Sequence, residues 1–199
     1  MRILIVGATG TIGHAVVAAL KPRHELVLAS RTKSPERVEL TNPESVRALY
    51  KRAGRFDAVV SVAGEAAYKP LTQLTDEDFA FSVGSKLMGQ VNLVRFGIES
   101  VSDGGSFTLT SGILATRPTP GGAAISMVNA GLDAFARAAA LELPRGIRIN
   151  TVTPPWVAET LTAMGRDPAG GLPASDVARS YVESVEGKQT GAVITPKKR

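Results

Sequence analysis

The chain has 199 residues, of which 44% are hydrophobic and 21% charged, and its formal net charge is +5. It has no cysteine and two histidines, which excludes disulfides and thiolate chemistry and gives no indication of a metal site. No apolar run approaches the roughly 18 residues of a membrane span, and no signal-peptide pattern opens the chain. We therefore expect a cytoplasmic protein with no membrane partner.

Strand-like and helix-like segments alternate along the chain. Four of the strand-like runs are almost unbroken aliphatic sequence, which is typical of strands buried on both faces of a parallel sheet. Alternation of this kind predicts right-handed βαβ units and a doubly wound α/β sheet. The predicted strands are Ile3–Val6, Glu25–Ala29, Arg37–Leu40, Phe56–Val62, Gly105–Thr110, Ile147–Val152 and Ala192–Thr195.

Two helices are predicted from apolar residues spaced three and four apart, over Lys86–Val101 and Ala124–Leu143. The segment Thr41-Asn42-Pro43-Glu44 is typical of a helix start, with a capping side chain, a proline in the first turn and an early acid. No repeat or linker divides the chain, so we expect one domain over residues 1–199.

The first strand runs into Gly7-Ala8-Thr9-Gly10-Thr11-Ile12-Gly13, which then opens a helix. Glycines in such a turn allow a tight bend, a close approach of the backbone to a pyrophosphate, and close packing of helix on strand. The helix N-terminus offers free N–H groups and a positive dipole to the phosphates. The spacing therefore predicts a Rossmann fold that binds a dinucleotide, although a tight turn that binds nothing has the same spacing.

The second strand leads into Ser30-Arg31-Thr32-Lys33, where an NAD-selective site would place an acid for the adenosine ribose. Arg31 could instead hold the 2′-phosphate of NADP with its guanidinium fork. NADP is therefore the favoured cofactor, while NAD stays possible because Arg31 and Lys33 could also be ordinary surface cations.

Several motifs further along the chain resemble those of the short-chain dehydrogenase/reductase family, in the same order and spacing. They are Glu39-Leu40-Thr41, which resembles the segment against adenine; Ala63-Gly64 at a strand end; Thr108-Leu109-Thr110-Ser111, which resembles the strand with the catalytic serine; Arg148-Ile149-Asn150-Thr151-Val152-Thr153-Pro154; and Thr190-Gly191. The resemblance implies that Trp156-Val157, after Pro154-Pro155, lie where the nicotinamide amide is gripped. With the glycine turn, it gives as cofactor contacts Gly7, Thr9, Gly10, Thr11, Ile12, Arg31, Glu39, Leu40, Ala63, Gly64, Asn129, Pro154, Trp156 and Val157.

The chain departs from this family at three places. Only Arg31–Glu36 separates the second and third strands, where the family has a helix, and the segment after Pro155 is short. Ile125 and Asn129 stand where the family has the tyrosine and lysine of Tyr-x-x-x-Lys. Because isoleucine cannot donate a proton, the family's usual mechanism is not open to this chain.

Two polar residues stay where the resemblance places chemistry. Ser111 matches the serine that bonds a substrate carbonyl, and Lys86 takes the place of an asparagine beside the active site. A buried Lys86 would have a lowered pKa and could donate the proton. Alternatively, Lys86 pairs with a carboxylate or backbone carbonyls, Ser111 is an ordinary strand-end serine, and Tyr68 is a loop or wall residue rather than an acid.

Three functions follow as hypotheses. The first is an NADP(H)-dependent oxidoreductase that acts on a small carbonyl, alcohol or quinone with Lys86 and Ser111 as its catalytic residues. The second is a non-catalytic dinucleotide-binding sensor or scaffold, which Ile125 and Asn129 favour. Nucleic-acid binding depends on charge alone, and we expect no such partner. The resemblance also implies a homodimer, or a tetramer, through the two predicted amphipathic helices.

Overall fold

The computed structural model describes residues 1–198. Seven parallel strands form one sheet in the order β3-β2-β1-β4-β5-β6-β7. Their bounds are β1 Arg2–Val6, β2 Glu25–Ser30, β3 Glu36–Arg37, β4 Phe56–Ser61, β5 Val101–Thr110, β6 Arg148–Val152 and β7 Val193–Ile194. The predicted doubly wound parallel sheet of seven strands is thus confirmed.

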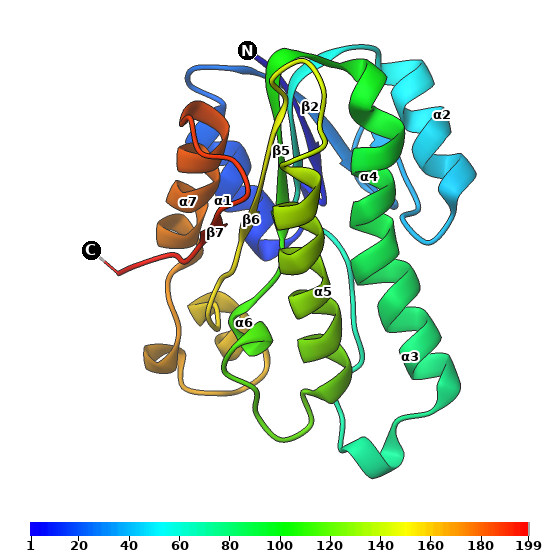
Figure 1. Cartoon of the computed structure of the whole chain (residues 1–199). Coiled ribbons are helices and arrows are strands. Elements are labelled where there is room, and N and C mark those ends of the chain that lie inside the picture. Colours follow the sequence, from blue (N-terminus) through cyan, green and yellow to red (C-terminus); the bar gives the residue numbers. More distant parts are fainter. Residues whose placement is uncertain (199) are drawn as a thin grey trace.

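Helices cover both faces of the sheet (Figure 1). α1 and α7 pack together on one face, while α2, α4 and α5 cover the other. Short helical segments α3, α6 and η1–η5 complete the chain. The bounds are α1 Thr11–Leu20, α2 Pro43–Ala53, η1 Leu71–Gln73, α3 Asp76–Ser82, η2 Val83–Met88, α4 Gly89–Gly97, η3 Ile98–Ser100, η4 Ile113–Ala115, α5 Ala123–Ala139, α6 Ala158–Ala163, η5 Pro168–Gly170 and α7 Ala174–Glu186.

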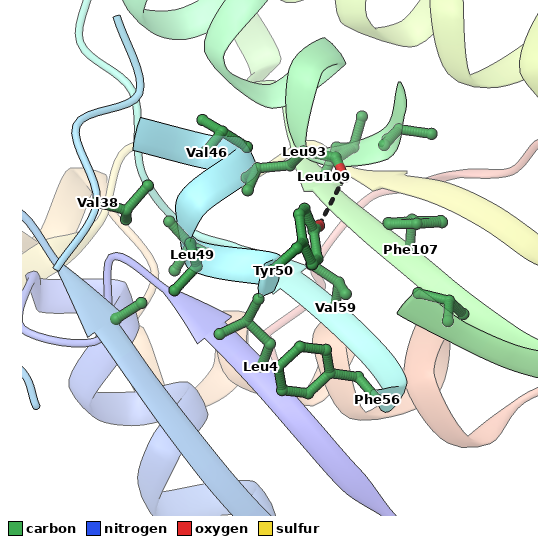
Figure 2. Packing of buried hydrophobic residues seen from close by; sticks show 14 of the residues in the cluster. Leu4, Val38, Val46, Leu49, Tyr50, Phe56, Val59, Leu93, Phe107 and Leu109 are labelled. Atoms are coloured by element: carbon green, nitrogen blue, oxygen red, sulfur yellow. Dashed lines mark hydrogen bonds between the residues drawn. The ribbon is translucent and has the colours of Figure 1, made fainter. Parts of the chain in front are cut away.

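Alternate side chains of β1 feed two separate cores, because successive residues of a strand point to opposite faces. Leu4 packs under α2, α4 and α5, whereas Ile3 and Ile5 pack under α1 and α7. Figure 2 shows the first core, where the buried Tyr50 hydroxyl of α2 donates to the Leu93 carbonyl of α4 at 2.6 Å. Burial raises the pKa of Tyr50, so this hydroxyl keeps its proton and joins the two helices.

The helix start predicted at Thr41–Glu44 is confirmed. The Asn42 side chain accepts hydrogen bonds from the backbone N–H groups of Glu44 at 2.9 Å and Ser45 at 3.3 Å, and Pro43 is the first residue of α2. No helix lies between β2 and β3, as the sequence predicts. The cofactor-facing edge is therefore built with one helix fewer than the family pattern.

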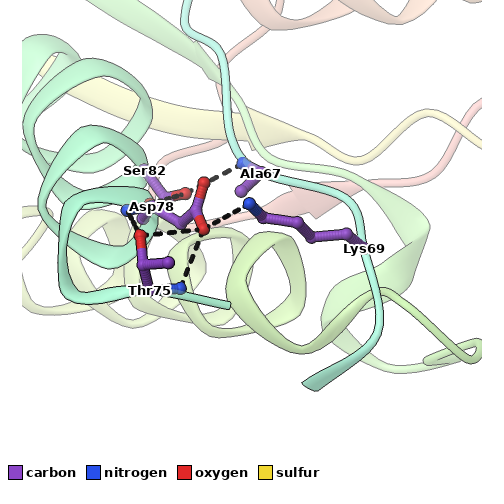
Figure 3. Close-up of polar contacts among 5 residues, drawn as sticks. All are labelled: Ala67, Lys69, Thr75, Asp78 and Ser82. Atoms are coloured by element: carbon purple, nitrogen blue, oxygen red, sulfur yellow. Dashed lines mark hydrogen bonds and ion pairs between the residues drawn. The ribbon is translucent and has the colours of Figure 1, made fainter. Parts of the chain in front are cut away.

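The predicted helix over Lys86–Val101 is wrong at its start. A continuous helical rod begins ten residues earlier, at Asp76, and runs through the π-helical turn η2 into α4. Its start is fixed by a capping box in which Thr75 Oγ1 accepts from the Asp78 N–H and Asp78 Oδ2 accepts from the Thr75 N–H (Figure 3). Lys86 consequently lies in the widened π-helical turn, which is often a functional feature.

Other predicted bounds also shift. β5 is longer than predicted and begins at Val101, β3 ends at Arg37 instead of Leu40, and α5 ends at Ala139 instead of Leu143. Pro144 lies shortly after the end of α5, as is common after helix C-termini. No helix within residues 1–198 is long and apolar enough to cross a membrane.

Candidate active site

The strand order reverses at β1, since β2 and β3 lie on one side of it and β4 to β7 on the other. In open α/β sheets, ligands bind at such a switch point, beyond the carboxyl ends of the strands. Two cavities lie in this region, one on the glycine turn and one at the ends of β5 and β6.

Two glycines of the turn are required by the packing of the protein itself. Gly7 has φ +88°, and a Cβ there would lie 2.8 Å from Ala63 Cβ and from the Val62 backbone. A Cβ on Gly13 would overlap the Gly7 carbonyl oxygen and approach the Ala8 carbonyl carbon to 2.8 Å. Glycine at these positions therefore supports the fold, whether or not a ligand binds.

Gly10 differs from both. Its backbone, at φ −82° and ψ 172°, is ordinary extended backbone, and a Cβ would meet nothing closer than the Gly7 carbonyl oxygen at 3.6 Å. Neither strain nor packing requires glycine at this position. Gly10 also begins α1 without a side-chain cap, so the first N–H groups of the helix are left for another acceptor. Both features fit the close approach of a phosphate to the backbone.

The first cavity has a volume of about 270 Å³ and is called the cofactor cleft below. Eight of the predicted cofactor residues line it: Gly7, Thr9, Gly10, Arg31, Glu39, Leu40, Ala63 and Gly64. The remaining lining residues were not predicted: Val6, Ser30, Val38, Val62, Glu65 and Ser85. Thr11, also predicted, begins α1 between Gly10 and Ile12 and lines neither cavity.

Two charged groups of the cofactor cleft are already engaged. Glu39 Oε1 accepts hydrogen bonds from the Thr41 N–H at 3.2 Å and the Thr41 hydroxyl at 3.0 Å. Arg31 Nη2 lies 3.7 Å from Glu65 Oε1, and both side chains are about two-thirds exposed, at 66% and 63%. The guanidinium expected to hold a 2′-phosphate thus faces a carboxylate, which nothing in the local sequence around Arg31 indicates.

The second cavity, the catalytic pocket, has a volume of about 180 Å³. It brings together the predicted residues Ile12, Lys86, Ser111, Asn129, Pro154, Trp156 and Val157. Its other lining residues are Thr110, Gly112, Ile113, Leu114, Ile125, Pro155 and Thr160. Ile125 and Asn129 therefore both line this pocket, and its lining includes no tyrosine.

Lys86 is 8% exposed, and its Nζ donates to the Thr110 carbonyl oxygen at 3.3 Å. No carboxylate within residues 1–198 forms an ion pair with it. Burial lowers the pKa of Lys86 to about 8, because the charged ammonium loses water and gains no counter-charge. One backbone carbonyl uses one of its three protons, which leaves the ammonium able to donate into the pocket.

Ser111 and Asn129 add two weakly engaged polar groups. Ser111 Oγ lies 3.5 Å from the Val152 carbonyl oxygen, at the outer limit of a hydrogen bond, although the side chain is buried. Asn129 is 2% exposed, and its Oδ1 has no hydrogen-bond partner in the described part of the chain. Buried polar atoms are usually satisfied, so an unpartnered one on a residue that lines the pocket is a candidate for a contact with a ligand.

Gln90, which sequence reasoning missed, fixes the end of β5 beneath Lys86. It is fully buried, its Oε1 accepts from the Thr110 N–H at 2.8 Å, and its Nε2 donates to the Thr110 carbonyl at 2.9 Å. The same Nε2 contacts the Lys86 carbonyl at 3.1 Å. Gln90 therefore holds the carbonyl that Lys86 also contacts, and only its position four residues after Lys86 could have indicated this.

A strap over residues 62–75 leads from β4 to the rod and covers Lys86. The Ser85 hydroxyl accepts a hydrogen bond from the Glu65 N–H at 3.0 Å. Figure 3 shows two further contacts of the strap: the Ser82 hydroxyl accepts from the Ala67 N–H at 2.9 Å, and Lys69 pairs with Asp78 at 2.6 Å. A Cβ on Gly64 would lie 2.9 Å from Lys86 Cα. The strap thus packs against Lys86 at Gly64 and contributes to its burial.

Tyr68 lies on this strap as a loop residue. Its ring meets the Trp156 ring edge-on at 6.0 Å between centroids, and its hydroxyl is 3.0 Å from Thr119 Oγ1. The Arg166 guanidinium lies over the Trp156 ring, 5.2 Å from the ring centroid. Three loops therefore meet at Trp156 beside the catalytic pocket.

Within residues 1–198, no group of His, Cys, Asp or Glu side chains is placed to hold a metal.

Comparisons with known proteins agree with this fold. The family model described as Enoyl-(Acyl carrier protein) reductase matches residues 14–192. Hydroxynaphthalene reductase arp2 of Aspergillus fumigatus is 29% identical over 150 residues, which are 73% of this chain and 55% of that protein. The short-chain dehydrogenase/reductase ucsE of Acremonium sp. is 31% identical over 56% of this chain and 45% of its own length. The chain thus spans about half the length of these curated relatives.

Solved structures cover the chain more completely. The protein lin1944 from Listeria innocua is 44% identical, with a TM-score of 0.95 and 98% of both chains covered. A small-chain dehydrogenase in complex with NADPH is 25% identical, with a TM-score of 0.87 over 98% of this chain and 95% of that one. By its family-model match, its relatives and its fold, this chain belongs to the short-chain dehydrogenase/reductase family of oxidoreductases.

Proposed function

We propose that this chain is an NADP(H)-dependent oxidoreductase that reduces a small carbonyl or quinone, with Lys86 as its proton donor. The observation that carries the proposal is a buried lysine without a carboxylate partner, in the same small apolar pocket as Ser111. Burying an ammonium without a counter-charge costs free energy, because the charged group loses its water. A site that only binds a ligand or supports the fold gains nothing that would offset this cost.

The cofactor cleft fits a dinucleotide on the evidence of Gly10 and the uncapped α1. In this proposal the turn holds the pyrophosphate, Arg31 the 2′-phosphate, and Leu40 and Ala63 the adenosine side of the cleft. Asn129, Pro154, Trp156 and Val157 would hold the nicotinamide end. When bound, the reduced nicotinamide supplies a hydride to the substrate carbon.

The chain's own residues supply the remainder of the chemistry. The Ser111 hydroxyl donates a hydrogen bond to the substrate oxygen, and the Lys86 ammonium gives that oxygen a proton as negative charge develops on it. The resulting neutral amine of Lys86 regains a proton from solvent. The apolar wall of Ile12, Ile113 and Ile125 excludes water, which strengthens both polar interactions.

Turnover of purified protein tests the proposal. We expect oxidation of NADPH with a panel of quinones, aromatic aldehydes and conjugated ketones. Lys86→Ala should lower kcat by about 10²- to 10⁴-fold, the usual contribution of a general acid, while the Kd for NADPH stays within about twofold. Lys51→Ala, which removes an exposed lysine of α2, is the matched control and should keep full activity. Equal activity, or equal inactivity, of wild type and Lys86→Ala contradicts the proposal.

Ile125 favours a second candidate, a dinucleotide-binding sensor without turnover. The pocket has isoleucine where the family has its tyrosine acid, so binding could persist after catalysis is lost. A sensor is expected to show unequal thermal stabilisation by the oxidised and reduced cofactor, since ligands stabilise the state that they bind. Such a difference, with no turnover on the whole panel, would support the sensor over the oxidoreductase.

We also propose that the chain forms a homodimer through the rod and α5. Phe81 and Met127 are exposed apolar side chains on α3 and α5, at 43% and 45%. Light scattering after size-exclusion chromatography measures the mass directly, and a monomer at micromolar concentration contradicts this part of the proposal.

A further inference from the structure

The ion pair of Arg31 and Glu65 spans the cofactor cleft. Arg31 follows β2 and Glu65 follows β4, and these strands flank β1, whose end carries the glycine turn. The pair therefore reaches across the turn from one side of the cleft to the other. A dinucleotide that uses the turn must pass beneath this pair or separate it.

Glu65 is anchored by its backbone and free at its carboxylate. Its N–H donates to the buried Ser85 hydroxyl at 3.0 Å, within the strap that is also tied to Ser82. Its side chain is 63% exposed and contacts only Arg31 among the charged groups of the described chain. The carboxylate thus stays at the cleft even when Arg31 turns to another anion.

The charges that line the cofactor cleft are unusual for a protein with a net charge of +5. Its ionisable lining residues are Arg31, Glu39 and Glu65, which is one cation against two anions. Glu39 is held by Thr41, so Glu65 is the acid free to compete for Arg31. A nucleotide with an additional phosphate meets more repulsion in this cleft than one without it.

We propose that Glu65 sets the cofactor selectivity of this cleft. It competes with a 2′-phosphate for Arg31 and so restrains the preference for NADP(H) over NAD(H). The inference rests on the proposed function, because it requires that the cleft bind a nicotinamide dinucleotide. A 2′-phosphate takes Arg31 only by displacing Glu65, and afterwards it lies near a carboxylate that stays on the strap. NAD(H) has no such group and does not meet this cost.

The test is the ratio of the Kd for NADH to the Kd for NADPH, measured by calorimetry on the full chain. Glu65→Gln keeps the shape of the side chain and removes its charge. We expect it to tighten NADPH binding about fivefold at low salt, as for an exposed ion pair, and to leave NADH within about twofold. In 0.5 M salt the gain should fall to about twofold or less, because exposed charges are screened.

Two further variants separate this inference from simpler explanations. Glu44→Gln removes one negative charge from α2, outside the cleft, and should leave both nucleotides unchanged. In an Arg31→Gln background, Glu65→Gln should lose most of its effect, because the two residues act through one another.

Each other result has a definite meaning. An unchanged Kd ratio in Glu65→Gln, or the same change in Glu44→Gln, overturns the inference. Weaker NADPH binding in Glu65→Gln also overturns it, and would make Glu65 a support for Arg31 instead. If wild type binds neither nucleotide, the proposed function itself fails, which is a different result from binding both with an unaltered ratio. Thermal unfolding of each variant shows whether its fold is intact.

Discussion

The cofactor cleft and the catalytic pocket lie at the same edge of the sheet, yet they are built in different ways. The glycine turn of the cleft depends on backbone, with Gly7 and Gly13 set by close packing and Gly10 left open. The pocket depends on side chains from separate elements, with Lys86 in the π-helical turn, Ser111 after β5 and Asn129 on α5. Backbone N–H groups of the turn stay in place in most variants that keep the fold. A site made of side chains loses a functional group when one residue is substituted.

That contrast is consistent with the sequence, which has the glycine turn and has Ile125 and Asn129 where the resemblance places the tyrosine and lysine of the family. Ile125 removes the acid of the usual mechanism without disturbing α5, whose buried face is formed by other residues such as Val128 and Leu132. Lys86 lines the pocket from the π-helical turn of the rod. The proposed activity thus combines the cofactor cleft with a proton donor, Lys86, that differs from the tyrosine of the family. Variants of the cofactor cleft and variants of the catalytic pocket should therefore behave differently.

The largest expected effect is the pH dependence of reduction. Lys86 must be protonated to donate, and its pKa is lowered to about 8 by burial. The rate should therefore be constant below about pH 8 and fall as pH rises, by about 100-fold at pH 10. Initial rates at saturating NADPH between pH 6 and 10 measure this. A rate that stays constant to pH 10 would show that Lys86 is not the donor.

The next effect concerns stability. The pKa of Lys86 is about 8 in the folded state, below its ordinary 10.5. Below pH 8 the native state therefore buries a charged ammonium, and the loss of its water lowers the stability of the fold. Lys86→Met should remove this penalty and raise the free energy of unfolding by about 2 kcal/mol at pH 7, after about 1 kcal/mol is deducted for the lost hydrogen bond. The unfolded chain binds more protons than the native one between pH 8 and 10.5, so wild type gains stability over that range.

Urea unfolding of both proteins at pH 7 and pH 10 measures the difference. We expect it to shrink at pH 10, because the native state of the wild type has by then lost the Lys86 proton and most of the penalty for burying a charge. Lys51→Met, at an exposed position of α2, should change the stability by less than about 0.5 kcal/mol at either pH. A Lys86→Met protein that is less stable than wild type at pH 7 would contradict the lowered pKa.

Gly13→Ala and Gly10→Ala form a matched pair within the cleft. The Cβ of Gly13→Ala would overlap the Gly7 backbone, so this variant should lose about 1–3 kcal/mol of stability. The Cβ of Gly10→Ala meets no atom closer than 3.6 Å, so its stability should be unchanged. Its NADPH affinity should nevertheless fall about tenfold, since the methyl group lies where a phosphate approaches the turn.

Thermal unfolding and calorimetry on the two variants separate these effects. Full NADPH affinity in Gly10→Ala would show that the second glycine has no role in binding, and a loss of stability would show that packing does require a glycine there.

The sequence predicts the cleft better than the pocket, for physical reasons. Glycine spacing is local, so Gly7, Gly10 and Gly13 are readable from seven consecutive residues. Four of the seven strands are readable from aliphatic runs, and the bounds of β3 and β5 differ from those predicted. By contrast, Glu65 meets Arg31 across 34 positions and Gln90 meets Thr110 across 20, and neither pairing has a local pattern. The start of the rod differs from the prediction by ten residues, because its apolar spacing begins well after its cap at Thr75.

The smallest expected effect tests whether the two regions act on one cofactor. Asn129 Oδ1 has no partner in the described chain, so Asn129→Ala removes no hydrogen bond made by that atom. Thermal stability should therefore stay nearly unchanged, whereas most buried asparagines cost stability when truncated. NADPH affinity should fall about threefold if this oxygen accepts a hydrogen bond from the nicotinamide end. Affinity for 2′,5′-ADP, which has only the adenosine end, should not change. An equal loss for both ligands would place the effect of Asn129 in the fold and not at the nicotinamide end, and would separate the pocket from the cleft.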